Sequence, residues 1–98
     1  MEIIKTQEDT KLTIALDGRL DTITSKDLET ELRASIDGIT ELVFDFEKLT
    51  YITSAGLRVV SVAQKFMNKQ GSMVIKNANP EVKEVFDITG LTDVLTIE

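Results

Sequence analysis

Two adjacent hydroxyl side chains, Thr53 and Ser54, are the residues of this sequence best suited to carry chemistry. They lie where an apolar, strand-like run at 41–46 gives way to an apolar, helical run at 57–67. At the first turn of a helix, a hydroxyl can accept hydrogen bonds from unpaired backbone N–H groups. The same N–H groups and the helix dipole also favour a phosphate. Ser54 is therefore either a plain helix N-cap, which the local sequence alone favours, or a switch set by phosphorylation.

Two kinds of side chain that enzymes often use are missing from the sequence. There is no histidine and no cysteine, so Ser-His-Asp and thiolate catalysis are excluded within this chain. Histidine is also the commonest metal ligand, and we expect no metal site. There is no G-x-x-x-x-G-K-[ST] loop and no carboxylate cluster with suitable spacing. We therefore expect a protein without catalytic residues or a cofactor of its own, rather than an enzyme.

Composition indicates one ordinary globular domain, residues 1–98. Of the 98 residues, 42% are hydrophobic and 29% are charged. The formal net charge of -6 argues against binding to nucleic acid or to anionic membrane surfaces. No apolar run approaches the ~18 residues that a membrane span needs, and the N-terminus lacks a signal-peptide pattern. We expect a soluble, cytoplasmic protein.

Hydrophobic periodicity predicts strands that alternate with helices. The expected elements, in chain order, are strands at 2–7 and 11–16, a helix from Thr24 to Gly38, a strand at 42–46, a helix from the hydroxyl pair to Gln70, a strand at 73–75, a helix from Pro80 to Gly90 and a strand at 94–97. This β-β-α-β-α-β-α-β order predicts a single small α/β domain. Its sheet should be mixed but largely parallel, with about five strands and with helices packed on it.

Local signals predict where strands end and helices begin. Thr24 is a suitable N-cap, and Ile23 and Leu28 have the spacing of a hydrophobic staple. Asn79 is the expected N-cap of the last helix, because a proline follows it at the first helical position. The pair at 17–18, Asp-Gly, predicts a turn or bulge that ends the second strand.

Two acidic residues have less certain places in this scheme. Asp21 is suited to capping a turn. Asp45 is unusual inside an apolar strand, and we expect it at a sheet edge or paired with a lysine. Neither has a neighbour in the sequence that would support catalysis.

The helix after the hydroxyl pair has two apolar rows. The first row should face the sheet; it consists of Gly56, Val60, Ala63 and Met67. The second row lies beside it and consists of Ala55, Val59, Val62 and Phe66. This second row either packs against a neighbouring helix or is partly exposed beside Ser54 to receive a partner. Gly56 likewise allows close packing on a strand or the close approach of a partner.

Several motifs occur in an order that is typical of one family. They are Gly18-Arg19-Leu20-Asp21, Phe44-Asp45-Phe46, Leu49-Thr50-Tyr51-Ile52, Thr53-Ser54-Ala55-Gly56-Leu57, Asn77 and Gly90-Leu91. Together they resemble the STAS domain, the family of bacterial anti-sigma factor antagonists, over essentially the whole chain. The fourth motif resembles the family's phosphorylation motif, D-S-[ST]-G-[LI].

The resemblance implies a partner switch centred on Ser54. In such proteins the unphosphorylated form binds a serine-kinase anti-sigma factor and frees the sigma factor. The kinase supplies ATP, phosphorylates the serine and dissolves the complex. Asp21 corresponds to the family's acidic residue near that serine. The partner-binding residues implied in this way are Asp21, Thr53, Ser54, Ala55, Gly56, Arg58, Val59 and Val62. We expect the free protein to be a monomer.

One departure from the family motif leaves alternatives open. Thr53 stands before the serine, where phosphorylated members usually have aspartate. Thr53 is thus an alternative phosphoacceptor. The same departure favours a second function, a STAS scaffold without a phosphate switch, or a subunit of a signalling or lipid-transport assembly.

Overall fold

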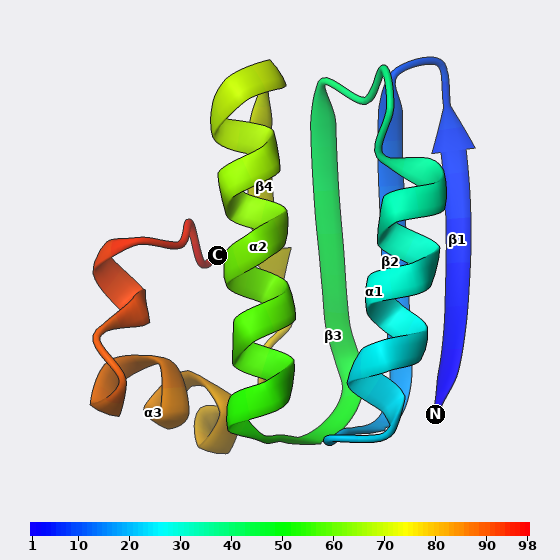
Figure 1. Cartoon of the computed structure of the whole chain (residues 1–98). Helices are drawn as coiled ribbons and strands as arrows, with labels where there is room; N and C mark the ends of the chain where they lie inside the picture. Colours follow the sequence, from blue (N-terminus) through cyan, green and yellow to red (C-terminus); the bar gives the residue numbers. More distant parts are fainter.

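The computed structural model describes residues 1–98, and its four strands form one sheet in chain order, β1-β2-β3-β4 (Figure 1). The strands are β1 (Glu2–Glu8), β2 (Lys11–Leu20), β3 (Glu41–Ile52) and β4 (Ser72–Lys76). β1 and β2 form an antiparallel hairpin, whereas β2, β3 and β4 are parallel to one another. The mixed, largely parallel sheet predicted from the sequence is therefore confirmed.

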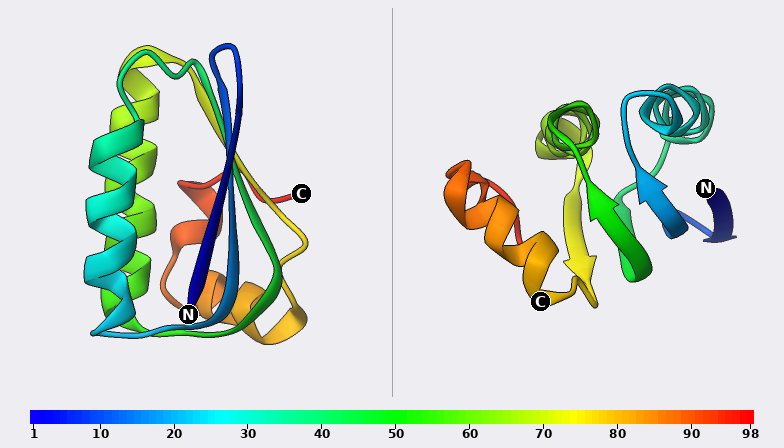
Figure 2. Two further views of the ribbon diagram at one scale, coloured as in Figure 1. Left: turned by 90° about the vertical axis from the view of Figure 1, so that its right-hand side faces the viewer. Right: turned by 90° about the horizontal axis from the view of Figure 1, so that it is seen from below.

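Three helices accompany the sheet. They are α1 (Thr24–Ser35), α2 (Ser54–Gln70) and α3 (Pro80–Ile88), and a short 3-10 turn, η1 (Leu91–Asp93), follows. Figure 2 shows α1 and α2 side by side on one face of the sheet, with α3 beyond the β4 edge. Each crossover helix connects two parallel strands, as a parallel sheet requires.

The predicted fifth strand is wrong. Of the residues at 94–97, only Ile97 pairs with the sheet, through a single parallel bridge to Ile75. The η1 turn occupies the preceding residues, and its cap residue Val94 still has helical dihedral angles. Too few residues remain for a ladder, so the sheet has four strands.

β2 and β3 are both longer than their apolar patterns predicted. The pair at 17–18 does not end β2, which continues to Leu20 across irregularities in the register with β3. Gly18 adopts φ 118° there, so the bulge that this pair predicted is present. β3 continues to Ile52, because the second half of β2 keeps pairing with it. A strand paired across a bulge loses its alternating pattern, and its second half then looks like a loop in the sequence.

The core lies between the sheet and the two helices. Alternate residues of β2 and β3 point into it, and its largest side chains include Phe44 and Phe46 from β3. Phe86 of α3 stacks on Phe46, with ring centroids 6.4 Å apart, which joins α3 to the same core. The expected cap of α3 is confirmed, because the Asn79 side chain accepts from the Val82 N–H at 2.8 Å.

The first apolar row of α2 faces the sheet as predicted, and every member is buried. Gly56 explains how α2 approaches so closely. A Cβ at this position would lie 2.7 Å from Leu20 Cγ and 2.9 Å from Ile52 Cγ1. Both contacts are shorter than van der Waals distance, so the start of α2 rests directly on the ends of β2 and β3. Of the two explanations offered for Gly56, close helix-to-strand packing is the one observed.

This contact predicts that Gly56→Ala destabilises the protein, although alanine favours helices. Overpacking of a filled core costs about 1–3 kcal/mol, which exceeds the ~1 kcal/mol gain in helix propensity at most of that range. Urea unfolding measures the difference. Lys65→Ala, at an exposed position of α2, is the control and should change stability by less than about 0.5 kcal/mol. An alanine variant as stable as the wild type would contradict the packing explanation.

Candidate functional site

The parallel pairing of β2 and β3 brings the two predicted parts of the site together. Leu20, the last residue of β2, is the register partner of Ile52, the last residue of β3. The Thr53 N–H then donates to the Leu20 carbonyl oxygen at 3.0 Å. The loop after β2 and the first turn of α2 are therefore neighbours at one end of the sheet. In open α/β sheets, this carboxyl end of the strands is where sites are usually built.

The two hydroxyls of the pair have different environments. Thr53 is half-buried and is the N-cap residue of α2, with extended dihedral angles. Its Oγ1 makes no capping bond to the helix and instead donates to the Leu20 carbonyl at 3.4 Å. Ser54 is the first helical residue and is exposed. The N-cap reading of Ser54 is therefore wrong by one position, and its side chain faces solvent at the positive end of the helix dipole.

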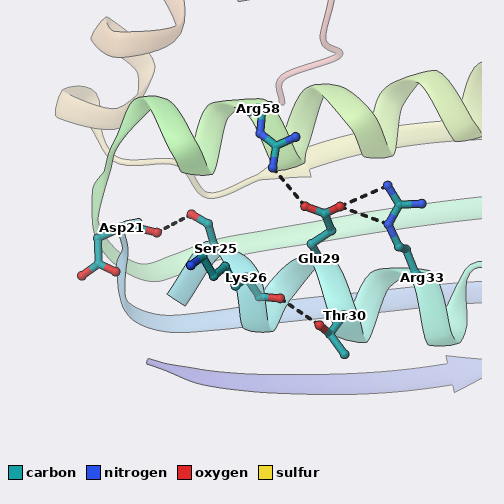
Figure 3. Close-up of polar contacts among 7 residues, drawn as sticks. All are labelled: Asp21, Ser25, Lys26, Glu29, Thr30, Arg33 and Arg58. Carbon is teal, nitrogen blue, oxygen red and sulfur yellow. Dashed lines mark hydrogen bonds and ion pairs between the residues drawn. The ribbon is translucent and has the colours of Figure 1, made fainter. Parts of the chain in front are cut away.

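Asp21 is the residue that caps the start of α1. Its Oδ1 accepts from the backbone N–H groups of Ile23 and Thr24, at 3.0 and 2.9 Å. Its carbonyl oxygen accepts from the N–H of Ser25 at 2.9 Å and from the Ser25 hydroxyl (Figure 3). Asp21 thus occupies the turn-capping role that its sequence position suggested.

The expectation that Thr24 caps α1 is wrong, and so is the staple. Thr24 is the first helical residue, and its hydroxyl donates to the carbonyl oxygen of Arg19 at 2.7 Å. Ile23 is 76% exposed and packs against no staple partner in the core. The chain leaves β2 at an angle that Asp21 stabilises, and this turns Ile23 outward.

The capping contacts change the acidity of Asp21. The N–H of Thr24 is the largest influence, and with the Thr24 hydroxyl, the N–H of Ile23 and the charge of Arg19 it lowers the pKa of Asp21. Partial desolvation acts in the opposite direction but does not reverse the shift. Hydrogen bonds to the ionised form favour that form, so the carboxylate is the state that caps the turn.

The remaining predicted partner residues differ in exposure. Gly56 and Val59 are buried, so neither is accessible to a partner in this structure. Ala55 and Val62 are half-buried, and Arg58 is exposed. Phe66, the last member of the second apolar row, contacts α1, where the guanidinium of Arg33 lies 5.4 Å from its ring centroid. Val59 belongs to the core and Phe66 packs against it, so packing within the domain accounts for these two members of the row.

Arg58 connects the two helices at this end of the sheet. Its Nη2 lies 3.2 Å from Oε1 of Glu29 on α1. The other carboxylate oxygen of Glu29 binds Arg33, one turn further along α1, at 3.0 Å. Figure 3 shows Glu29 between the two guanidinium groups.

Two exposed apolar residues near the hydroxyl pair were not assigned to the site from the sequence. Ile23 lies in the loop after β2, and Tyr51 is 46% exposed near the end of β3, with the guanidinium of Arg19 4.6 Å from its ring centroid. A shallow cavity of about 110 Å³ adjoins Tyr51; it is lined by Thr50, Tyr51, Ile52, Glu81, Val82 and Val85. One feature of the sequence could have indicated Tyr51 as part of the site: it is the chain's one tyrosine and precedes the hydroxyl pair by two residues.

Asp45 has a structural role away from this site. β3 is an inner strand, so the expectation of a sheet edge is wrong. Its Oδ1 accepts from Asn77 Nδ2 and from the N–H of Glu47, each at 3.0 Å, rather than pairing with a lysine. Asn77 follows β4 with φ 63°, so this contact stabilises the turn into the next helix.

No helix of the structure has the length and apolar character to cross a membrane.

Comparisons with known proteins agree with the family resemblance of the sequence motifs. The sequence profile of the STAS domain matches residues 2–98. BtrV of Bordetella bronchiseptica, provisionally described as an anti-sigma factor antagonist, is 36% identical over 99 residues. That match covers 99% of this chain and 85% of BtrV.

Solved structures agree with the fold. An anti-sigma factor antagonist from Mycobacterium paratuberculosis matches with a TM-score of 0.89 at 20% identity, over 98% of this chain and 83% of that one. The phosphorylated form of the Bacillus cell fate determinant SpoIIAA matches with a TM-score of 0.79 at 20% identity, over 99% of this chain and 91% of that one. At these identities the likeness establishes the fold.

The lowered pKa of Asp21 predicts a pH dependence of stability. The folded-state pKa lies below the unfolded value, so the stabilisation by Asp21 is complete above about pH 4 and is lost as pH falls through the folded pKa. Asp21→Asn keeps an acceptor oxygen but removes the charge. We expect this variant to be less stable than the wild type at pH 7, with a difference that shrinks below about pH 4.

Urea unfolding at pH 7, 5, 4 and 3 measures the difference between Asp21→Asn and the wild type. Asp37→Asn, an exposed aspartate at the other end of α1, is the control for loss of one negative charge. A stability difference between Asp21→Asn and the wild type that stays constant from pH 7 to 3 would contradict the capping role of the carboxylate.

Proposed function

The chain belongs to the STAS domain family of anti-sigma factor antagonists, and we propose that it is a partner switch controlled at Ser54. The unphosphorylated protein binds a serine-kinase anti-sigma factor in the cytoplasm as a monomer. The kinase, which holds the ATP, phosphorylates Ser54 and releases the complex. The chain itself supplies an acceptor hydroxyl and a binding surface and has no catalytic role.

The position of Ser54 is the observation that carries this proposal. It is exposed at the first residue of α2, where the free N–H groups of the first turn and the helix dipole favour an added phosphate. The backbone on either side is fixed, because Thr53 bonds to Leu20 and Gly56 rests on the strand ends. A kinase can reach such a hydroxyl, and the product is stabilised where it forms.

The same observation favours Ser54 over Thr53 as the acceptor. The Thr53 side chain is half-buried and its hydroxyl is directed to the Leu20 carbonyl oxygen. Phosphorylation there would require the extended N-cap residue to turn its side chain outward. Thr53 instead replaces the family's usual aspartate as a neutral neighbour, which leaves the site less negative before modification.

The charge of a phosphate supplies a physical reason for release. A phosphoserine adds about -1.5 to -2 charges at neutral pH to a side chain that carried none. A partner surface complementary to the unmodified protein would then meet a like charge or an unmatched anion. Such contacts cost several kcal/mol, and each ~1.4 kcal/mol lowers affinity tenfold.

The direct test is the intact mass of the protein recovered from its native cells, followed by mapping of any phosphate by peptide fragmentation. One phosphate on Ser54 is the expected result. A phosphate on Thr53 would keep the switch but move the acceptor. An unmodified protein under every growth condition would overturn the switch and favour the constitutive scaffold, which the Thr53 substitution already suggests.

The proposed switch predicts how substitutions of Ser54 change binding to the kinase. Ser54→Asp should lower affinity for the kinase of the same organism by about tenfold or more, while Ser54→Ala should bind and resist phosphorylation. Isothermal titration and a phosphorylation assay measure the two effects. Ser72→Asp, an exposed serine at the opposite end of the sheet, is the matched control. Unchanged binding of Ser54→Asp would support the scaffold instead.

The exposed apolar residues beside Ser54 predict a further part of the partner surface. Ile23 contributes little to the core, so Ile23→Ser should change stability by less than about 0.5 kcal/mol. It should nevertheless weaken partner binding by about tenfold, as expected for loss of a central apolar contact. Ile88→Ser, equally 76% exposed at the far end of α3, is the control. Equal effects of the two variants on affinity would exclude a specific role for the Ile23 loop.

A further inference from the structure

Glu29 holds two arginines at once, and the two contacts differ. Arg33 is on the same helix and approaches one carboxylate oxygen with both Nε and Nη2, at 3.1 and 3.0 Å. Arg58 comes from α2 and makes one contact, at 3.2 Å, with the other oxygen. The Arg58 side chain is 69% exposed, whereas that of Glu29 is 25% exposed. The contact with Arg58 is thus the longer and more accessible half of the cluster (Figure 3).

Arg58 is also one helical turn from the proposed phosphoacceptor. Residues four apart lie next to each other on a helix surface, with Cβ atoms about 5–6 Å apart. Ser54 and Arg58 are both exposed, so no packed side chain separates them from solvent on this side of α2. A long, exposed arginine can therefore reach a phosphate on Ser54 by changing rotamer, with no movement of the backbone.

We propose that Arg58 is shared between two anions: it binds Glu29 when Ser54 is unmodified and turns to the phosphate when Ser54 is phosphorylated. This inference rests on the proposed function, because it assigns the internal consequence of modification at Ser54. The exchange transfers no covalent group. It replaces one charge-assisted hydrogen bond, between α2 and α1, with another within α2.

The chemistry of the two anions favours the exchange. A phosphate carries more negative charge than a carboxylate and presents three acceptor oxygens, which suit the planar guanidinium. The phosphate on Ser54 and Arg58 would both belong to α2, whereas Glu29 belongs to α1. Arg58 would therefore bind the phosphate without a contact to another helix. Glu29 is not left as an unpaired charge, because Arg33 keeps its two contacts to the other oxygen. The Glu29 carboxylate therefore remains paired when Arg58 leaves it.

The consequence is a change in how α1 and α2 are connected. In the unmodified protein the pair Arg58–Glu29 ties the first turns of α2 to the middle of α1. After the exchange that tie is absent at the end of the domain where Asp21 and Ile23 lie. Arg58 is then directed along α2 rather than across to α1, so the charge pattern of the proposed partner surface changes at two positions, Ser54 and Arg58.

The exchange is tested with the full chain carrying phosphoserine encoded at position 54, which needs no kinase. Phosphorus NMR measures the second pKa of the phosphate. A neighbouring guanidinium favours the dianion, so Arg58→Gln should raise this pKa by about 0.3–1 unit. In Arg58→Lys, the retained positive charge should keep the phosphate pKa lower than it is in Arg58→Gln. Lys69→Gln removes an exposed cation from the last turn of α2, outside the Glu29 cluster, and should leave the phosphate pKa unchanged.

A second measurement follows the tie to α1. A double-mutant cycle of Glu29→Gln and Arg58→Gln, read by urea unfolding, should give a coupling between the two residues in the unmodified protein. The same cycle should lose that coupling in the phosphoserine protein. The exchange would be overturned if the phosphate pKa were the same in Arg58→Gln and the wild type. It would also be overturned if the coupling between Glu29 and Arg58 were unchanged in the phosphoserine protein.

The two proposals fail in different experiments. An unmodified Ser54 in native cells would overturn the phosphorylation switch, but the encoded phosphoserine would still show whether Arg58 turns to it. Conversely, a phosphate found on Ser54 in cells with no response to Arg58→Gln would leave the switch intact and remove only the exchange.

Discussion

The parallel pairing of β2 with β3 along their whole length is the constraint on which the rest of the structure depends. It ends both strands at the same level, at Leu20 and Ile52. The first turn of α2 can then rest on both strand ends, because Gly56 has no side chain to hold it away. The Thr53 N–H completes the junction by bonding to Leu20. One register thus fixes the position of Ser54, the start of α2 and the loop that carries Asp21.

That junction separates rigid from exposed parts of the site. On the side of α2 that faces the sheet, Gly56 and Val59 are buried. The Ser54 hydroxyl, the Arg58 guanidinium and the Ile23 side chain are exposed. A negative charge added on this side meets solvent, the helix dipole and one nearby cation, and it does not have to displace core packing. The backbone can therefore accept the charge without rearranging.

The sequence predicted the features that depend on local chemistry. The end of α2 at Gln70, the cap at Asn79 and the sheet-facing row of α2 each follow from residues within a few positions of one another. The resemblance to the STAS family placed the site at Ser54 and Asp21, and the fold brings their two loops together through the strand pairing. The resemblance and the local patterns thus predicted two segments that the fold makes neighbours, and their role as a binding site stays a prediction.

The features that the sequence did not predict depend on contacts between distant segments. The second half of β3 is stabilised by pairing across irregularities in the register with β2, and no local pattern records that pairing. Thr24 and Asp21 are both good capping residues, and only the direction in which the chain leaves β2 decides that Asp21 does the capping. The exposure of Ile23 follows from the same direction.

Arg58 illustrates why the charged surface was the hardest part to predict. In the sequence it is one of several polar residues on the outer side of α2. The family resemblance included it in the partner surface, but no local pattern predicted that it pairs with Glu29. Its difference arises because α1 and α2 lie side by side, which places Glu29 within 3.2 Å of it, and because it is one turn from Ser54. A single residue is thereby connected to both the neighbouring helix and the proposed acceptor. If phosphorylation is read as a change of charge and not of backbone, the surface that a partner senses includes Arg58 as well as the phosphate, since the two anions compete for the same guanidinium.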